Sequence, residues 1–174
     1  VDIREDATLP LTFDGAQSTL TGSAKVEGQN NAVSFTNGAN WNVTGASNVT
    51  ALTFDNATID TSKTDGDIVV SKLSGAGGTV VMDAAKTNKV DIADVDAQTK
   101  ITVKASENAD KVNVGQAVSM VDRLEGVTNK TGRVDEGMYQ GAITVDRTGH
   151  ATQAKNDLMV DTLELASAST LSLN

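Results

Sequence analysis

The residues in this sequence that could do chemistry are mostly carboxylates, because it holds 23 Asp and Glu residues, one histidine and no cysteine. Two of them, Asp14 and Asp55, each follow a short apolar segment ending in Phe, and Thr36 takes the same place between them. Glycoside hydrolysis needs two carboxyl groups about 5–10 Å apart. No aromatic platform or basic partner accompanies this pair, so we expect no enzymatic activity.

Calcium binding is the second chemistry to consider, at Asp65 and Asp67 or at Asp91, Asp94 and Asp96. A helix-flanked calcium loop needs ligands at fixed positions that end in Glu. A calcium-binding β-roll needs a glycine–aspartate nonapeptide repeat. The sequence has neither pattern, so we interpret these residues as solvated turn carboxylates and expect no metal and no cofactor.

Three other features carry no catalytic pattern. His150 follows a glycine in an expected turn, and no Ser–His–Asp set can be assigned around it, which favours a surface histidine. The glycine-rich run at 75–78 is not a phosphate loop, because no Lys-Ser or Lys-Thr follows it, and we expect it to be a flexible turn. The absence of cysteine excludes disulfides and thiolate ligands.

The composition favours short strands joined by tight turns. Val, Ala, Leu and Ile dominate the apolar residues, aromatic residues make up only 3%, and Thr, Asn, Ser, Asp and Gly are abundant. Branched residues favour strands, and small polar residues favour turns. The formal charge of −9, without any Lys/Arg cluster, would repel phosphate groups, so we expect no nucleic-acid partner.

A degenerate repeat in the first third of the chain indicates how these strands are arranged. The first set of anchors is Phe13, Phe35 and Phe54, spaced 22 and 19 residues apart. The second set is Leu20, Trp41 and Ile59, spaced 21 and 18 residues apart. A period of about 20 residues suits one coil of a β-solenoid and would stack the three phenylalanines in one inner column. The alternative is a β-sandwich, whose hairpins usually recur every 8–12 residues or so.

The pattern of short strands continues after Gly66 without the phenylalanine anchor. The sequence pattern changes after Gly126, where Tyr139, the segment 143–145 and the segment 151–152 predict a β-meander. In the tail, 156–174, capping residues precede apolar residues at helical spacing, which predicts a helix, although 171–173 alternates like a strand.

Four passages in this order resemble the pertactin-like C-terminal portion of autotransporter passengers. Residues 68–83 are similar to the family's passage of a strand, Leu-Ser-Gly-x-Gly and a strand ending in Met, and 89–92 to the short strand that follows it. Residues 118–121 and 132–139 resemble a later strand and a Val-Asp-x-Gly-x-Tyr turn. The resemblance implies an all-β fold, a right-handed single-stranded parallel β-helix with a C-terminal β-meander cap.

The resemblance also implies an organisation into three parts. Residues 1–65 would be β-helix coils of a passenger stem, 66–155 the C-terminal coils with an autochaperone-like cap, and 156–174 a linker leading to a membrane barrel. The residues expected to pack the core or the cap are Phe13, Phe35, Trp41, Phe54, Leu73, Val80, Met82, Val90, Ile92, Val121, Leu124, Tyr139 and Ile143.

The function implied by the resemblance is structural. The chain would act as folding nucleus and stem of a passenger that is secreted and displayed at the bacterial cell surface. Its partner would be its own C-terminal outer-membrane β-barrel, which is absent from this sequence. The alternative is an adhesin segment that binds a host surface, a glycan or another copy of itself, because exposed rows on a solenoid suit weak multivalent contacts.

Overall fold

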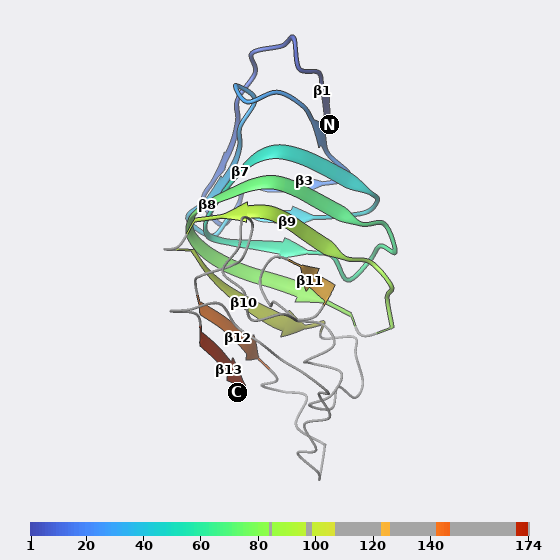
Figure 1. Cartoon of the computed structure of the whole chain (residues 1–174), viewed down its shortest axis with the longest axis vertical. Helices are drawn as coiled ribbons and strands as arrows, with labels where there is room; N and C mark the ends of the chain where they lie inside the picture. Colours follow the sequence, from blue (N-terminus) through green and yellow to red (C-terminus); the bar gives the residue numbers. More distant parts are fainter. Residues whose placement is uncertain (84, 97–98, 107–122, 126–141, 147–169, 174) are drawn as a thin grey trace.

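The computed structural model describes residues 1–83, 85–96, 99–106, 123–125, 142–146 and 170–173 (Figure 1). The described strands are β1 (Asp2–Ile3), β2 (Leu11–Asp14), β3 (Thr19–Thr21), β4 (Lys25–Val26), β5 (Val33–Thr36), β6 (Asn40–Asn42), β7 (Ser47–Asp60), β8 (Ile68–Met82), β9 (Val90–Val95), β10 (Lys100–Ala105), β11 (Leu124–Glu125), β12 (Ala142–Asp146) and β13 (Thr170–Leu173).

These strands form a β-solenoid in which successive coils stack along one axis (Figure 1). We number the coils 1 (residues 1–22), 2 (23–44), 3 (45–65), 4 (66–87) and 5 (88–106). Every pairing among the described strands is parallel, as in the pairing of β7 with β8 and of β8 with β10. The all-β parallel β-helix is therefore confirmed, and the β-sandwich, which requires antiparallel sheets, is wrong.

Each coil contributes to three faces: in coils 1 and 2 the first face carries β1 and β4, the second β2 and β5, and the third β3 and β6. The register on the second and third faces matches the repeat seen in the sequence. On the second face, Phe13 pairs with Phe35, and Phe35 pairs with Phe54. On the third face, Leu20, Trp41 and Ile59 pair in the same order. Both sets of anchors are thus inner columns, as the spacing predicted.

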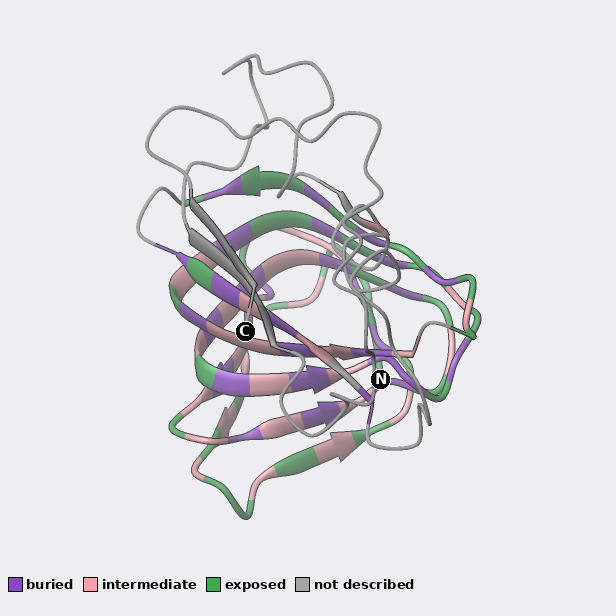
Figure 2. Ribbon diagram, turned by 90° about the horizontal axis from the view of Figure 1, so that it is seen from below, coloured by how far each residue is buried: buried purple, intermediate pink, exposed green. Residues whose placement is uncertain are grey.

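Burial alternates along the strands, as the colours of Figure 2 show. One residue therefore faces the interior of the solenoid and the next faces solvent. In β5 the inward Val33 and Phe35 are 1% and 0% exposed, whereas Ser34 and Thr36 between them are half-buried. This alternation follows from the two-residue period of a strand. The inner columns therefore form one continuous core.

The corner between the second and third faces needs a left-handed backbone. Asn37 and Asn56 have φ angles of 53° and 48° there, and Gly15 has a φ of 85° in coil 1. The backbone N–H of Asn37 donates to the backbone carbonyl of Asp55 in the next coil. Asn and Gly tolerate this conformation better than other residues, which explains the Asn and Gly that follow each Phe-containing strand.

Three expectations need correction or restriction. The run at 75–78 is not a turn between strands: it lies inside β8, where it forms a bulge against β7. The tail is not helical at 170–173, which form β13 in parallel with β12. In the predicted meander, β12 confirms a strand at 143–145, but it pairs in parallel with β10 and β13 and so continues the solenoid.

The remaining parts of the meander and tail, 139, 147–152 and 156–169, lie outside the described residues. The expected boundary at residue 65 falls between two closely paired strands, because β7 and β8 pair from Ser47 with Ile68 to Asp60 with Val81. The solenoid crosses this position as one ladder.

Candidate functional site: the inner columns and the Arg123 clamp

Stacked aromatic rings fill the inside of the first coils. The ring centroids of Phe13 and Phe35 are 4.8 Å apart with an interplanar angle of 8°. Phe35 also lies against Trp41, with centroids 5.6 Å apart and an angle of 1°. The Trp41 indole Nε1–H donates to the carbonyl oxygen of Gly22 at 3.0 Å. Each stacked pair adds about 0.5–1.5 kcal/mol beyond the burial of its area.

The third-face column continues beyond the aromatic part. After Ile59 it passes through Val80 and Val103 in coils 4 and 5. The backbone register then carries it to Val145 in β12 and Leu173 in β13. This column therefore links coil 1 to the last described strand through paired backbone at every step.

Most of the residues expected in the core or cap lie inside the solenoid. Buried ones are Phe35, Trp41, Phe54, Leu73, Val80, Met82, Val90 and Ile92. Phe13 is partly buried against the core. Leu124 lies in β11 opposite Val90, and Ile143 lies in β12 opposite Ile101. Val121 and Tyr139 lie outside the described residues.

Arg123 clamps the turn after β8 to the coil that contains β11. Its guanidinium Nη1 and Nη2 donate to the carbonyl oxygen of Asp83 at 3.2 and 3.1 Å. Nη1 also donates to the carbonyl oxygen of Lys86. Burial lowers the pKa of Arg123, and the nearby charge of Asp83 opposes that shift. Guanidinium groups remain protonated, so the clamp is charged at any physiological pH.

Sequence reasoning missed this clamp. Asp83 and Arg123 are 40 residues apart, and the acceptors are backbone carbonyls that any residue type carries. The only sequence signal is an arginine directly before the apolar Leu124. That pattern does not predict which turn the arginine would bind.

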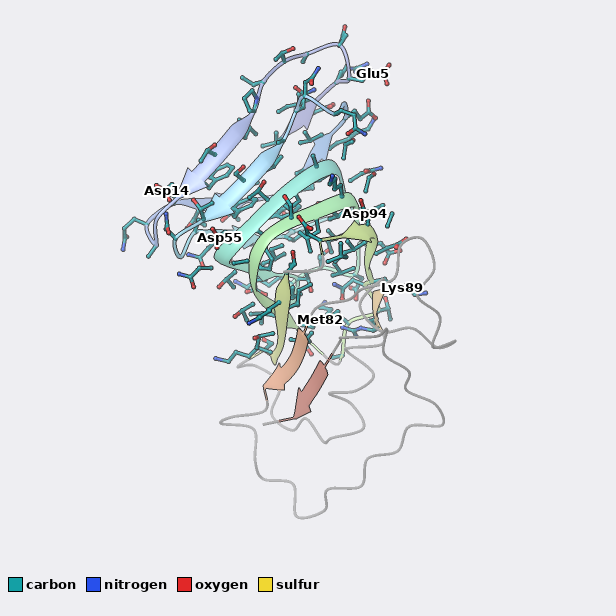
Figure 3. The ribbon with its side chains drawn as sticks, turned by 60° about the vertical axis from the view of Figure 1, so that its left-hand side comes forward. Glu5, Asp14, Asp55, Met82, Lys89 and Asp94 are labelled. Carbon is teal, nitrogen blue, oxygen red and sulfur yellow. The ribbon has the colours of Figure 1, made fainter. Side chains whose placement is uncertain are left out.

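The two carboxylates singled out for hydrolysis occupy matching places, but they serve the corner of the solenoid. Asp14 pairs with Thr36, and Thr36 pairs with Asp55, so a full coil lies between the two acids (Figure 3). The Asp14 carboxylate accepts hydrogen bonds of 2.7 Å from the Thr36 hydroxyl and from the Asn37 side-chain amide. These two bonds lower the pKa of Asp14, the Thr36 bond most.

Asp65 and Asp67 lie in the connection between β7 and β8, as predicted, whereas Asp91 and Asp94 lie inside β9, so their interpretation as turn carboxylates is wrong. The Asp65 carboxylate accepts from the Thr87 amide at 3.3 Å and lies 3.4 Å from the Lys86 ammonium. Asp67 accepts from the Lys89 amide at 2.8 Å. The side chains of Asp91, Asp94 and Asp96 are exposed. Among the described residues, no three His, Cys, Asp or Glu side chains converge on a possible metal position.

His150 lies outside the described residues. In the part of the chain that the structure describes, no helix is both long and apolar enough to cross a bilayer. Comparisons with protein-family models, curated proteins and solved structures found no match for this sequence.

Proposed function

We propose that this chain is the C-terminal part of a surface-displayed bacterial passenger, in which coils 4 and 5 and the strands after them act as folding nucleus and stem. In this proposal the chain works without catalysis, is exported to the cell surface, and has its own outer-membrane barrel as its partner. The observation that carries the proposal is the third-face ladder, which runs unbroken from β8 through β10 and β12 to β13.

A ladder of this kind supports nucleation because coils stabilise one another only through their neighbours. The first coil to order loses conformational entropy before any neighbour satisfies its backbone groups. A C-terminal end held by extra contacts lowers that barrier. Arg123 supplies such contacts, because it binds two carbonyls of the turn at 83–86 from a coil 40 residues further along the chain.

The competing function is adhesion, and the outward-facing residues of the third face support it. The outward row of the third face is polar in each of the first five coils. It consists of Thr19, Asn40, Thr58, Thr79 and Thr102. A regular polar row suits weak repeated contacts with a surface.

The folding role can be tested with a matched pair of variants. Val103 in coil 5 and Val49 in coil 3 are both 0% exposed, and Trp41, the only tryptophan, reports the folding of coil 2 by fluorescence. If the C-terminal coils fold first, Val103→Ala slows the Trp41 folding phase by up to about tenfold for a stability loss of about 1.4 kcal/mol. Val49→Ala instead accelerates unfolding and leaves the folding rate nearly unchanged.

The folding-nucleus role is wrong if Val49→Ala slows folding and Val103→Ala only accelerates unfolding. The role in display is tested by joining the chain to an outer-membrane barrel and deleting residues 67–174. Loss of the remaining coils from the cell surface supports the proposal. Normal display with altered adhesion supports the adhesin function instead.

A further inference from the structure

Asn37 and Gly38 form the only Asn-Gly pair in the sequence. An asparagine side chain loses its amide most readily before glycine, because glycine has no side chain to hinder attack by its own backbone nitrogen. Asn37 is exposed, and it lies at the corner between the second and third faces of coil 2. A reactive dipeptide therefore lies on the surface at a corner of the solenoid.

The reaction at such a pair needs only water. The backbone nitrogen of Gly38 gives its proton to a solvent base and attacks the Asn37 Cγ, while the side-chain nitrogen takes up a proton and leaves as ammonia. Water then opens the resulting succinimide. Aspartate forms when the bond from Cγ to the Gly38 nitrogen breaks. Isoaspartate forms when the bond from the backbone carbonyl carbon to that nitrogen breaks, and it lengthens the main chain by a methylene group.

The stacked coils hold the attacking nitrogen away from this reaction. The backbone N–H of Gly38 donates to the backbone carbonyl of Asn56 in coil 3 at 2.6 Å, and that of Asn37 donates to Asp55 at 3.1 Å. Asn37 and Gly38 both have left-handed backbones, with φ angles of 53° and 90°. The Gly38 nitrogen can turn toward the Asn37 Cγ only when the bond to coil 3 opens.

Coil 1 holds the group that would leave. The Asn37 side-chain nitrogen donates to Asp14 Oδ1 at 2.7 Å. A carboxylate at position 37 could not donate this bond and would lie against the Asp14 carboxylate, and like charges across neighbouring strands are destabilising. Deamidation would therefore remove one bond between coils 1 and 2 and put a repulsion in its place.

We propose that Asn37 is a site of spontaneous deamidation, which coil 3 closes when it stacks on coil 2. The amide is kept in a chain whose coils are stacked, and it is lost in a chain that stays open at this corner. Because the loss is irreversible in water, the content of aspartate and isoaspartate at position 37 records how long the corner has been open. The site is independent of the folding-nucleus role, since it depends on this corner and not on which coil folds first.

Asn56 is a matched comparison inside the chain. It is exposed at the same corner of the next coil and has a left-handed backbone with a φ of 48°. The residue after it is Ala57, whose Cβ hinders the attack that glycine permits. We expect Asn56 to stay intact where Asn37 reacts.

The test compares the whole chain with a peptide of residues 34–41, both incubated in mildly alkaline buffer. Peptide mapping measures aspartate and isoaspartate at position 37 over time. We expect Asn37 to react at least about tenfold more slowly in the folded chain than in the peptide, because the reaction requires local opening. Equal rates would overturn the proposal, and so would an Asn37 that stays intact in the peptide.

Two variants at position 56 test whether the carbonyl of coil 3 closes the site. Asn56→Val puts a β-branched residue into the left-handed conformation and so strains the backbone that carries this carbonyl. Asn56→Gly removes the same side chain and keeps that conformation accessible. We expect Asn56→Val to accelerate the loss of the Asn37 amide by about fivefold or more, and Asn56→Gly to leave its rate nearly unchanged. Equal rates in the two variants would assign the protection to something other than this carbonyl and overturn the proposal.

Val103→Ala separates the opening of the corner from the unfolding of the whole chain. It removes buried atoms in coil 5, where Val103 is 0% exposed, and does not touch the corner. We expect Asn37 to react in this variant at the wild-type rate. Acceleration equal to that in Asn56→Val would mean that global unfolding exposes Asn37, and gating by coil 3 would be wrong.

Discussion

Coils 1–3 and coils 4–5 fill the same inner space in different ways. The second face of the first three coils carries the column Phe13, Phe35 and Phe54. In coil 4 this column ends at the bulge of β8, where Gly75 lies so close to Phe54 that an added Cβ would come within 2.5 Å of its carbonyl oxygen. An added Cβ at Gly78 would come within 2.9 Å of the Phe54 ring.

The difference shows that the core is packed between coils rather than within each coil. The Phe54 ring projects toward coil 4, and glycine leaves the room that the ring occupies. Aliphatic residues such as Leu73 and Val80 complete the core of coil 4, both 2% exposed. An aromatic residue in one coil therefore determines which residues the next coil can accept at this corner.

The largest expected effect comes from removing a ring in the middle of the aromatic column. Phe35→Ala leaves a cavity between Phe13, Phe54 and Trp41 and should lower the free energy of unfolding by about 3–5 kcal/mol, measured by urea denaturation. Phe13→Ala is the matched control and should cost clearly less, because Phe13 is only partly buried. Equal losses in the two variants would show that the open end of the column is as well packed as its middle.

The second effect tests the fit between glycine and the aromatic ring. Gly78→Ala places a methyl group against the backbone of Ala57 and the ring of Phe54, and it should lower the free energy of unfolding by about 1–3 kcal/mol. Gly45→Ala is the control, because its nearest neighbour would be the Ser23 Cβ at 3.6 Å, an ordinary contact. We expect almost no change for the control in the same denaturation experiment.

An additional variant separates the ring from the backbone as the cause. Phe54→Leu shortens the side chain that faces Gly78. If the ring is responsible, the Gly78→Ala substitution costs less in the Phe54→Leu background than in the wild-type chain. An unchanged cost assigns the effect to the Ala57 backbone alone.

The third effect concerns the clamp at the aliphatic end. Arg123→Ala removes charge-assisted hydrogen bonds to the carbonyls of Asp83 and Lys86 and should cost about 1.5–3 kcal/mol of stability. Arg4→Ala, which changes an exposed arginine in coil 1, should stay within about 0.5 kcal/mol. Thermal denaturation of the two variants measures the difference. Equal melting temperatures would mean that the clamp adds nothing to the stack.

The same division separates what the sequence could predict from what it could not. The column of Phe13, Phe35 and Phe54 was predictable because large rings are rare in this chain and recur at the period of one coil. The bulge at 75–78 was misread as a turn, because glycine is equally common in turns and at close backbone approaches. Only the position of the Phe54 ring distinguishes the two cases.

The polar part of the structure was less predictable for a related reason. Asp14 and Asp55 were correctly aligned by their position after phenylalanine, but the sequence does not show that Thr36 and Asn37 donate to Asp14. The Arg123 clamp joins a turn and an arginine that are 40 residues apart in the sequence. Contacts to backbone carbonyls leave no trace in residue types, so sequence patterns do not reveal them.

The smallest expected effect tests the corner of the aromatic coils by pH. The hydrogen bonds from Thr36 and Asn37 favour the ionised form of Asp14, so its pKa in the folded chain lies below the ordinary value of 3.8. Its contribution to stability is therefore complete above the unfolded pKa and is lost as the pH falls through the lower, folded pKa. Because Asp14 is exposed, solvent screening keeps this contribution small.

Urea midpoints of the wild-type chain and of Asp14→Asn, compared from about pH 7 down to about pH 2, measure this contribution. We expect the two midpoints to differ at neutral pH and to converge in acid, because protonation removes the charge that the substitution also removes. In a Thr36→Val background the convergence should shrink, since the strongest donor is gone. A gap that stays constant across the whole pH range would mean that the corner is held by the left-handed backbone of Asn37 and not by the carboxylate beside it.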